Sequence, residues 1–426
     1  MTDGTATAHL YRPKLVTILR EGYGAALFQK DLLAGLTVAI VALPLSMAIA
    51  VASGVSPERG LYTAIVGGFL VSALGGSRFQ IGGPAGAFIV LVAATGAKLG
   101  LEGLLLTVLL SGLMLVMMGV LKLGSLIRHI PHAVTVGFTS GIAVTILASQ
   151  LKDFGGLHLA GAEPGPLLPK LAALYQALPT LNPSAFAVGL GSAALIFFLR
   201  WWRPAWPGML IAVAVASLAV ALLGLPAETI GTRFGGLPHG LPVPHLPAMS
   251  AALLWKVLPS ALSFTLLGGV ESLLSAKVAD GMTGRKHRSN MELVAQGVAN
   301  MVSALFGGIS VTGTIARTAT NIRAGARTPL SGIMHSAFLL LFILIAAGLA
   351  SYVPLAALAG VLVVVCWNMA EKAEFLRLLG YWREAAVLLV TFLLTLVEDL
   401  TMGILAGCAL AVFFALLKRA VREEGD

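Results

Sequence analysis

Apolar residues along this chain come in long runs that short polar or Gly/Pro-rich stretches separate. A membrane-spanning helix needs about 20 apolar residues, or fewer when the helix is broken, so each run is a candidate span. The candidate spans cover residues 32–53, 60–76, 84–98, 101–121, 133–150, 184–200, 205–224, 254–276, 290–306, 314–325, 328–349, 354–370, 384–398 and 400–418. The pattern predicts an all-α polytopic membrane protein with 14 transmembrane segments, seven in each half.

Composition supports this class and excludes others. Of the 426 residues, 58% are hydrophobic and only 11% are charged, which no ordinary soluble protein combines. The net charge of +9 is explained by Lys and Arg retained in cytoplasmic loops, so we expect a lipid bilayer as partner and no nucleic acid. Cys366 and Cys408 both lie in apolar runs and are interpreted as packing residues.

The distribution of positive charge tests the number of spans independently. With the N-terminus inside, the inner loops hold 21 of the 28 Lys and Arg residues and the outer loops hold 6. The remaining one, Arg317, lies within a span. Because cytoplasmic loops carry most Lys and Arg, we expect a multi-pass protein of the cell's inner (plasma) membrane with both termini cytoplasmic.

The two halves of the chain contain a repeated segment. The sequence Val71–Gly76 is nearly repeated as Val302–Gly308, at an offset of about 231 residues. Seven spans per repeat place the second half in the opposite orientation, and paired Gly/Pro-interrupted segments at matching positions mark transporter binding sites. We therefore predict two inverted seven-span repeats, with half-helices and short extended segments at spans 3 and 10.

Arg317 is the candidate centre of a binding site. A charge near the bilayer centre costs roughly 3 kcal/mol or more, so it persists mainly where it faces a cavity, a partner or a ligand. The N-termini of spans 3 and 10 would each add roughly +0.5 charge and unpaired N–H groups, which attract an anion. The alternative is an arginine whose side chain extends to the cytoplasmic interface. The predicted substrate-binding residues from this argument are Pro84, Ala85, Gly86, Gly313, Thr314, Ile315, Ala316 and Arg317.

Glu271 is the candidate proton-coupling residue, because it is the one carboxylate predicted to lie well inside an apolar span. A carboxyl group in an apolar cavity has its neutral form favoured, so it can take up and release a proton as the cavity opens to either side. The alternative is a static ion pair with Arg317 or Lys277.

No motif indicates an enzyme, a metal or a cofactor. The loop residues His158, His239 and His245 match no metal-ligand spacing and are interpreted as solvated side chains. The spans contain no nucleophile and base at a catalytic spacing. We therefore expect no catalytic residues, no metal site and no cofactor.

Three stretches together resemble the SulP family of anion transporters, the sulfate-permease and prestin-like proteins, over nearly the whole chain. They are Pro57–Ala64 with Gly76–Arg78, Glu271–Leu274 with Ala279–Gly281, and Gly313–Thr318. The resemblance implies anion binding between spans 3 and 10, with Leu45 and Ile49 of span 1 and Glu271 of span 8 lining the site. It also implies a core domain that moves against a gate domain. The implied parts are cytoplasmic ends at 1–31 and 420–426, core halves at 32–122 and 254–349, and gate halves at 123–253 and 350–419.

The chain departs from the family pattern at two site positions. Many members have Gln after the proline of span 1, where this chain has Leu45, and an aromatic residue near the position of Ala85. We therefore expect a roomier and less polar pocket. The family usually carries a cytoplasmic STAS domain after the last span, which the printed sequence lacks, and a homodimer would form mainly through that domain.

The sequence thus predicts a secondary active transporter that performs proton-coupled symport of a small anion by an elevator-like movement. The anion could be a dicarboxylate, sulfate or bicarbonate. The alternatives are an anion exchanger or channel of the same fold, or a nucleobase permease, although Arg317 favours an anionic substrate. A membrane-embedded enzyme is the remaining rival, and no residue cluster supports it.

Overall fold

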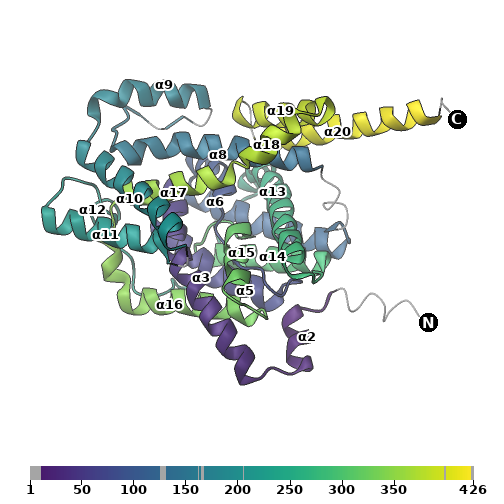
Figure 1. Cartoon of the computed structure of the whole chain (residues 1–426), viewed down its shortest axis with the longest axis horizontal. Helices are drawn as coiled ribbons and strands as arrows, with labels where there is room; N and C mark the ends of the chain where they lie inside the picture. Colours follow the sequence, from purple (N-terminus) through teal and green to yellow (C-terminus); the bar gives the residue numbers. More distant parts are fainter. Residues whose placement is uncertain are drawn as a thin grey trace.

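The computed structural model describes residues 11–423, except 125–130, 162, 165–166, 205 and 398–399. The first ten residues of the predicted N-terminal segment and the last three of the predicted tail lie outside these ranges. Within them the chain is almost entirely helical, and Figure 1 shows the helices stacked across one another.

Helices lie at every predicted span of the first half. They are α3 (Ala25–Ala52), α4 (Pro57–Tyr62) continued through a π-helical turn (Thr63–Gly67) into α5 (Gly68–Leu74), α6 (Ile89–Val120), α8 (His132–Gly155), α10 (Pro183–Trp202) and α11 (Gly208–Leu223). Three shorter helices accompany them: α2 (Lys14–Glu21) before α3, α9 (Leu167–Ala177) between α8 and α10, and α12 (Ile230–Phe234) after α11. Helix α6 covers two predicted spans, and its backbone breaks at Gly100, where φ is 70° and ψ is −177°.

The second half follows the prediction in the same way. Its helices are α13 (Ala251–Thr283), α14 (Ser289–Leu305), α15 (Ile315–Arg323), α16 (Leu330–Ala350), α17 (Leu355–Met369), α18 (Lys372–Leu379), α19 (Trp382–Val397) and α20 (Leu400–Glu423). Across the described ranges, seven helical segments are long and apolar enough to cross a membrane, and two shorter apolar helices accompany them. The class of the fold, a mainly helical polytopic membrane protein, is therefore the predicted one.

Two short extended segments meet in the centre of the molecule. Strand β1 (Gly82–Gly83) pairs antiparallel with β2 (Thr312–Gly313), so that Gly82 lies opposite Gly313 and Gly83 opposite Thr312. A short 3-10 turn and then α6 follow β1, and the nine-residue α15 follows β2. The extended segments predicted before spans 3 and 10 are therefore present, and α15 is a short helix, whereas the helix of span 3 continues as α6 with a backbone break at Gly100.

Buried side chains satisfy the backbone of these extended segments, which a membrane interior requires. The Asn300 amide donates to the carbonyl of Val311 (2.8 Å) and accepts from its N–H (2.9 Å). The hydroxyl of Thr318 accepts from the N–H of Ile81, and the amide of Asn321 donates to the carbonyl of Phe79. The irregular backbone is tolerated because polar side chains of α14 and α15 replace the hydrogen bonds that a helix would supply.

The helices pack in two groups. In one group, α6 packs against α13 and α14, and α16 packs against α3 and α5. In the other, α8 packs against α17 and α19, α10 packs against α17, and α19 packs against α20. Helix α3 also contacts α17, so the two groups face each other there. Figure 1 shows α8, α17, α18 and α19 above α3, α5 and α16 in that view.

Candidate functional site

Arg317 lies in the first turn of α15, and its side chain is 1% exposed. Among the described residues it is the largest side chain that is fully buried. Its guanidinium turns toward the chain segment after β1. Nη2 donates to the carbonyl of Pro84 and to the hydroxyl of Ser46 on α3, both at 3.2 Å. Nε and Nη1 have no hydrogen-bond partner among the described residues. The side chain of Arg317 therefore lies inside the protein and does not extend to its surface.

A cavity of about 440 Å³ lies beside this arginine, between the two groups of helices. Helices α3, α13 and α15 and the segment after β1 form one wall, and α8, α11 and α17 form the other. The lining also includes Asn368 and Glu371, which are both exposed, so the cavity reaches the surface at the C-terminal end of α17. The residues that line the cavity are mainly apolar. We expected this from Leu45 and Ala85, which stand where many family members have a glutamine and an aromatic residue.

Most of the predicted site residues line this one cavity. They are Leu45, Ile49, Pro84, Ala85, Gly86, Thr314, Ile315, Ala316 and Arg317, together with Glu271. Gly313 is the exception and does not line the cavity. It lies in β2 behind the wall, where its N–H donates to the hydroxyl of Ser272 and an added Cβ would lie 1.7 Å from Nε2 of Gln80. The role of Gly313 is close backbone packing.

Glu271 projects from α13 into the same cavity as Arg317. Its Oε2 has no hydrogen-bond partner, and Glu271 forms no ion pair with Arg317 or Lys277 within the described part of the chain. The alternative of a static ion pair is therefore not found in this conformation. Arg317 and Glu271 thus line one cavity, and each has buried polar atoms without a hydrogen-bond partner among the described residues.

Gly83 allows the arginine to adopt this position. A Cβ at residue 83 would lie 1.9 Å from Nη1 of Arg317, which is the far end of a flexible side chain. We therefore expect Gly83→Ala to fold, because the guanidinium moves aside, but to take up anions severalfold more slowly. Uptake assays combined with thermal unfolding would separate these two effects. A matched control is Gly348→Ala on α16, where an added Cβ meets nothing within 4 Å.

Several residues of the site were missed from the sequence. Ser46, which accepts from Arg317, is a hydroxyl within an apolar span. The second wall contributes Phe138 and Ile142 of α8 and Val365 of α17, and nothing in their apolar sequence distinguishes them from lipid-facing neighbours. The wall facing Arg317 could therefore be found only from the packing of the two groups of helices.

Two carboxylates away from the central cavity are completely buried, which the sequence analysis did not predict. Asp31 at the start of α3 and Glu292 in the first turn of α14 are both 0% exposed. Neither lines the central cavity. Both lie near the ends of apolar runs, where the sequence gives no sign that a loop folds over them.

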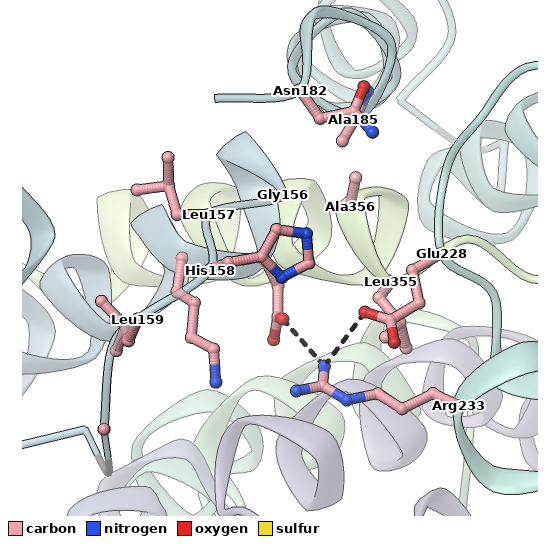
Figure 2. A pocket seen from close by; sticks show the side chains of 13 residues that line it. Gly156, Leu157, His158, Leu159, Asn182, Ala185, Glu228, Arg233, Leu355 and Ala356 are labelled. Carbon is pink, nitrogen blue, oxygen red and sulfur yellow. Dashed lines mark hydrogen bonds and ion pairs between the residues drawn. The ribbon is translucent and has the colours of Figure 1, made fainter. Parts of the chain in front are cut away.

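A second cavity, of about 470 Å³, lies under the loops around α12, and Figure 2 shows its charged side chains close together. Arg233 bridges Asp153 at 2.9 Å and Glu228 at 3.8 Å, which joins α12 to the C-terminal end of α8. His158 also lines this cavity. No group of three or more His, Cys, Asp or Glu side chains that could hold a metal occurs among the residues described. Arg233, Asp153 and Glu228 therefore form an ion-pair cluster that links α12 to α8.

Fold and cavity together define a class: polytopic helical membrane proteins in which two broken helices meet beside a buried cationic side chain. The chain belongs to the sulfate permease family, because the sequence profile of that family matches residues 28–417. It is therefore an anion transporter of this family, and not an enzyme. The resemblance noted from the sequence is confirmed.

Similar proteins cover nearly all of the chain. "Putative sulfate transporter YvdB" of Bacillus subtilis (strain 168) is 43% identical over 397 residues, which are 92% of this chain and 74% of that protein. "Bicarbonate transporter BicA" of Synechocystis sp. (strain ATCC 27184 / PCC 6803 / Kazusa) is 33% identical over 415 residues, which are 93% of this chain and 72% of that protein.

Solved structures agree with the fold. The transmembrane domain of a cyanobacterium bicarbonate transporter BicA matches with a TM-score of 0.79 and 32% identity, over 92% of this chain and 98% of that one. The structure of SLC26A9 matches with a TM-score of 0.88 over 97% of this chain and 69% of that one. Its identity of 19% means that this second likeness supports the fold alone.

Proposed function

We propose that this protein carries a small inorganic or carboxylic anion across the membrane together with protons, by binding both in the cavity beside Arg317. One observation carries the proposal: the guanidinium of Arg317 is 1% exposed at the wall of a cavity, and its Nε and Nη1 have no hydrogen-bond partner among the described residues. A buried donor without a partner costs about 1–3 kcal/mol, and more for a charged group. An oxyanion in the cavity would remove that cost by accepting charge-assisted hydrogen bonds.

The direction of the opening follows from charge. The cavity reaches the surface near Asn368, whose side chain accepts a hydrogen bond from Arg200, and Lys372 and Arg377 lie just beyond. Cytoplasmic loops retain Lys and Arg, so we assign this end to the cytoplasm and propose that the structure is open inward. Cations at the mouth would also raise the local concentration of an anion.

We assign the two groups of helices as core and gate. The proposed core comprises α3 to α6 and α13 to α16, and the proposed gate comprises α8 to α12 and α17 to α20. The antiparallel pairing of β1 with β2 supports an inverted repeat, because it joins the short extended segments that precede α6 in the first half and α15 in the second. Movement of the core along the gate would then carry the site between the two sides, as an elevator does. Homodimer formation stays a prediction.

The candidate anions are chosen from the names of similar proteins and from the size and lining of the cavity. Proteins similar to this chain are named as sulfate or bicarbonate transporters, so sulfate and bicarbonate are the first substrates to test. The apolar lining and the volume of about 440 Å³ also leave room for a dicarboxylate. A neutral nucleobase would leave the guanidinium uncompensated, which argues against a nucleobase permease.

The test is uptake into proteoliposomes that contain the purified full chain. Radiolabelled sulfate, bicarbonate and a dicarboxylate are supplied separately, with and without an inward proton gradient. We expect saturable uptake of at least one anion and stimulation by the gradient. Uptake that stays linear with concentration would indicate a channel, and equal uptake of a neutral nucleobase would contradict the proposed anion site.

A further inference from the structure

A third cavity, of about 480 Å³, lies on the face of the protein where α2 meets the ends of α13 and α15. It shares no lining residue with the cavity beside Arg317. Arg78, Arg285 and Arg327 line it, and Glu21 is the one acidic lining residue. The cavity therefore has a net positive lining at a place that the transport site does not use.

Three carboxylates hold the segments that carry these arginines. Glu292 accepts from the N–H groups of Gly76 and Ser77, at 2.8 and 3.0 Å, directly before Arg78. Because Glu292 is completely buried, this contact fixes the chain at the end of α5. The position of Arg78 in the cavity is therefore determined by a rigid backbone.

The backbone at Arg327 is held by a buried carboxylate in the same way. Asp31 accepts from the N–H of Arg327 at 2.7 Å and from the N–H and hydroxyl of Thr328. Tyr23 donates its hydroxyl to the second oxygen of Asp31 at 3.2 Å, and burial in this position raises the pKa of Tyr23 to about 12.

Asp280 holds the turn that carries Arg285. It accepts from the backbone N–H of His287 at 3.1 Å and from the ring Nδ1 at 2.7 Å, which closes the turn after α13. The oxygens of these carboxylates are thus engaged with the backbone and with neighbouring side chains, and none of them forms an ion pair with Arg78, Arg285 or Arg327 among the described residues.

The arginines themselves are only partly compensated. Arg78 pairs with Glu21 at 3.1 Å, whereas Arg285 and Arg327 form no ion pair among the described residues and are exposed. Two further cations lie close by. Burial and then the charges of Arg288 and Arg78 lower the pKa of Lys14, and burial and then Arg12 and Arg78 lower the pKa of Arg288. The cations of this face therefore repel one another in the absence of an anion.

We propose that this cavity, which we call the arginine pocket (Arg78, Arg285 and Arg327), binds a phosphoryl group of a phosphorylated small molecule or of a lipid headgroup. Guanidinium groups engage phosphate oxygens bidentately, and a phosphate carries enough charge to relieve the repulsion between several of them. A ligand here would touch the 75–78 segment, the turn after α13 and the turn after α15, so it would hold these parts of the proposed core together.

Pyrophosphate is the probe for a first test. It is titrated against the purified full chain in phosphate-free detergent solution, and the dissociation constant is measured at two salt concentrations. The double variant Arg285→Gln/Arg327→Gln should raise the dissociation constant roughly 100-fold, because removing each charge-assisted hydrogen bond weakens binding about tenfold. Arg323→Gln is the matched control, because Arg323 is exposed on α15 but does not line the pocket. Arg317→Ala should bind pyrophosphate as the wild type does, which separates this site from the transport site.

The second arm distinguishes the source of the phosphoryl group. The chain is placed in nanodiscs of phosphatidylcholine with or without phosphatidic acid, and pyrophosphate binding is measured again. Competition by phosphatidic acid in the wild type identifies a lipid headgroup as ligand, and undiminished binding identifies a soluble phosphate. The proposal is overturned if pyrophosphate does not bind, if the double variant binds it as tightly as the wild type, or if Arg317→Ala abolishes the binding.

Discussion

Replacing Arg317 by alanine should abolish anion uptake or slow it severely while the protein still folds. The guanidinium donates to Pro84 and Ser46, and its other two nitrogens are left for a ligand. Loss of charge-assisted hydrogen bonds should raise the dissociation constant of the anion roughly ten- to hundredfold. Equilibrium binding and initial uptake rates in proteoliposomes would measure this effect.

Arg317→Lys should recover little of this loss. A lysine ammonium is a point charge, so it cannot contact the Pro84 carbonyl and an oxyanion with the geometry of a planar fork. Arg323→Ala is the matched control, since Arg323 lies further along the same helix and is exposed. Normal uptake by Arg317→Ala would show that the anion binds elsewhere.

The central part of the fold could be predicted because its local sequence is unusual. Glycine and threonine before Ile315, and glycine around Pro84, are poor helix formers, so a break in each apolar run follows from propensity alone. The near-repeat of Val71–Gly76 then indicated that the two breaks correspond. Pairing of β1 with β2 brings them together, although the sequence did not specify that Gly313 would pack against Gln80 behind the cavity.

The opposite wall of the cavity could not be predicted for a physical reason. In a membrane, a side chain that faces lipid and one that faces a cavity or another helix are both apolar, so polarity does not separate them. Phe138 and Ile142 have the same sequence character as exposed residues of the same helix, such as Val144 and Leu147. Only the packing of α8 and α17 against α3 decides which residues reach the site.

The burial of carboxylates near the ends of the spans could not be predicted from the sequence for a related reason. Asp31 and Glu292 lie where a charge is normally solvated at the membrane surface, and that is how the sequence presents them. Their burial arises from the loops at 75–77 and 327–328, which fold back onto them and donate N–H groups. Such long-range contacts join residues more than 200 positions apart and leave no local pattern.

Replacing Glu271 by glutamine should uncouple anion movement from protons. Glu271 lines the cavity with Arg317, and its Oε2 has no partner among the described residues. In apolar surroundings the charged form of a carboxyl group is disfavoured, and an anion arriving nearby disfavours it further by like-charge repulsion. We therefore expect proton and anion to bind cooperatively, in which case each strengthens the binding of the other by the same factor.

Glutamine mimics the protonated carboxyl permanently, so Glu271→Gln should retain anion exchange and lose the stimulation by an inward proton gradient. Glu371→Gln is the matched control, because Glu371 lines the exposed end of the same cavity and should leave the stimulation intact. The measurement compares initial uptake with and without the gradient, beside exchange of labelled for unlabelled anion. Accumulation that the gradient still drives in Glu271→Gln would assign proton coupling to another residue. Loss of both exchange and uptake would instead make Glu271 part of the anion site.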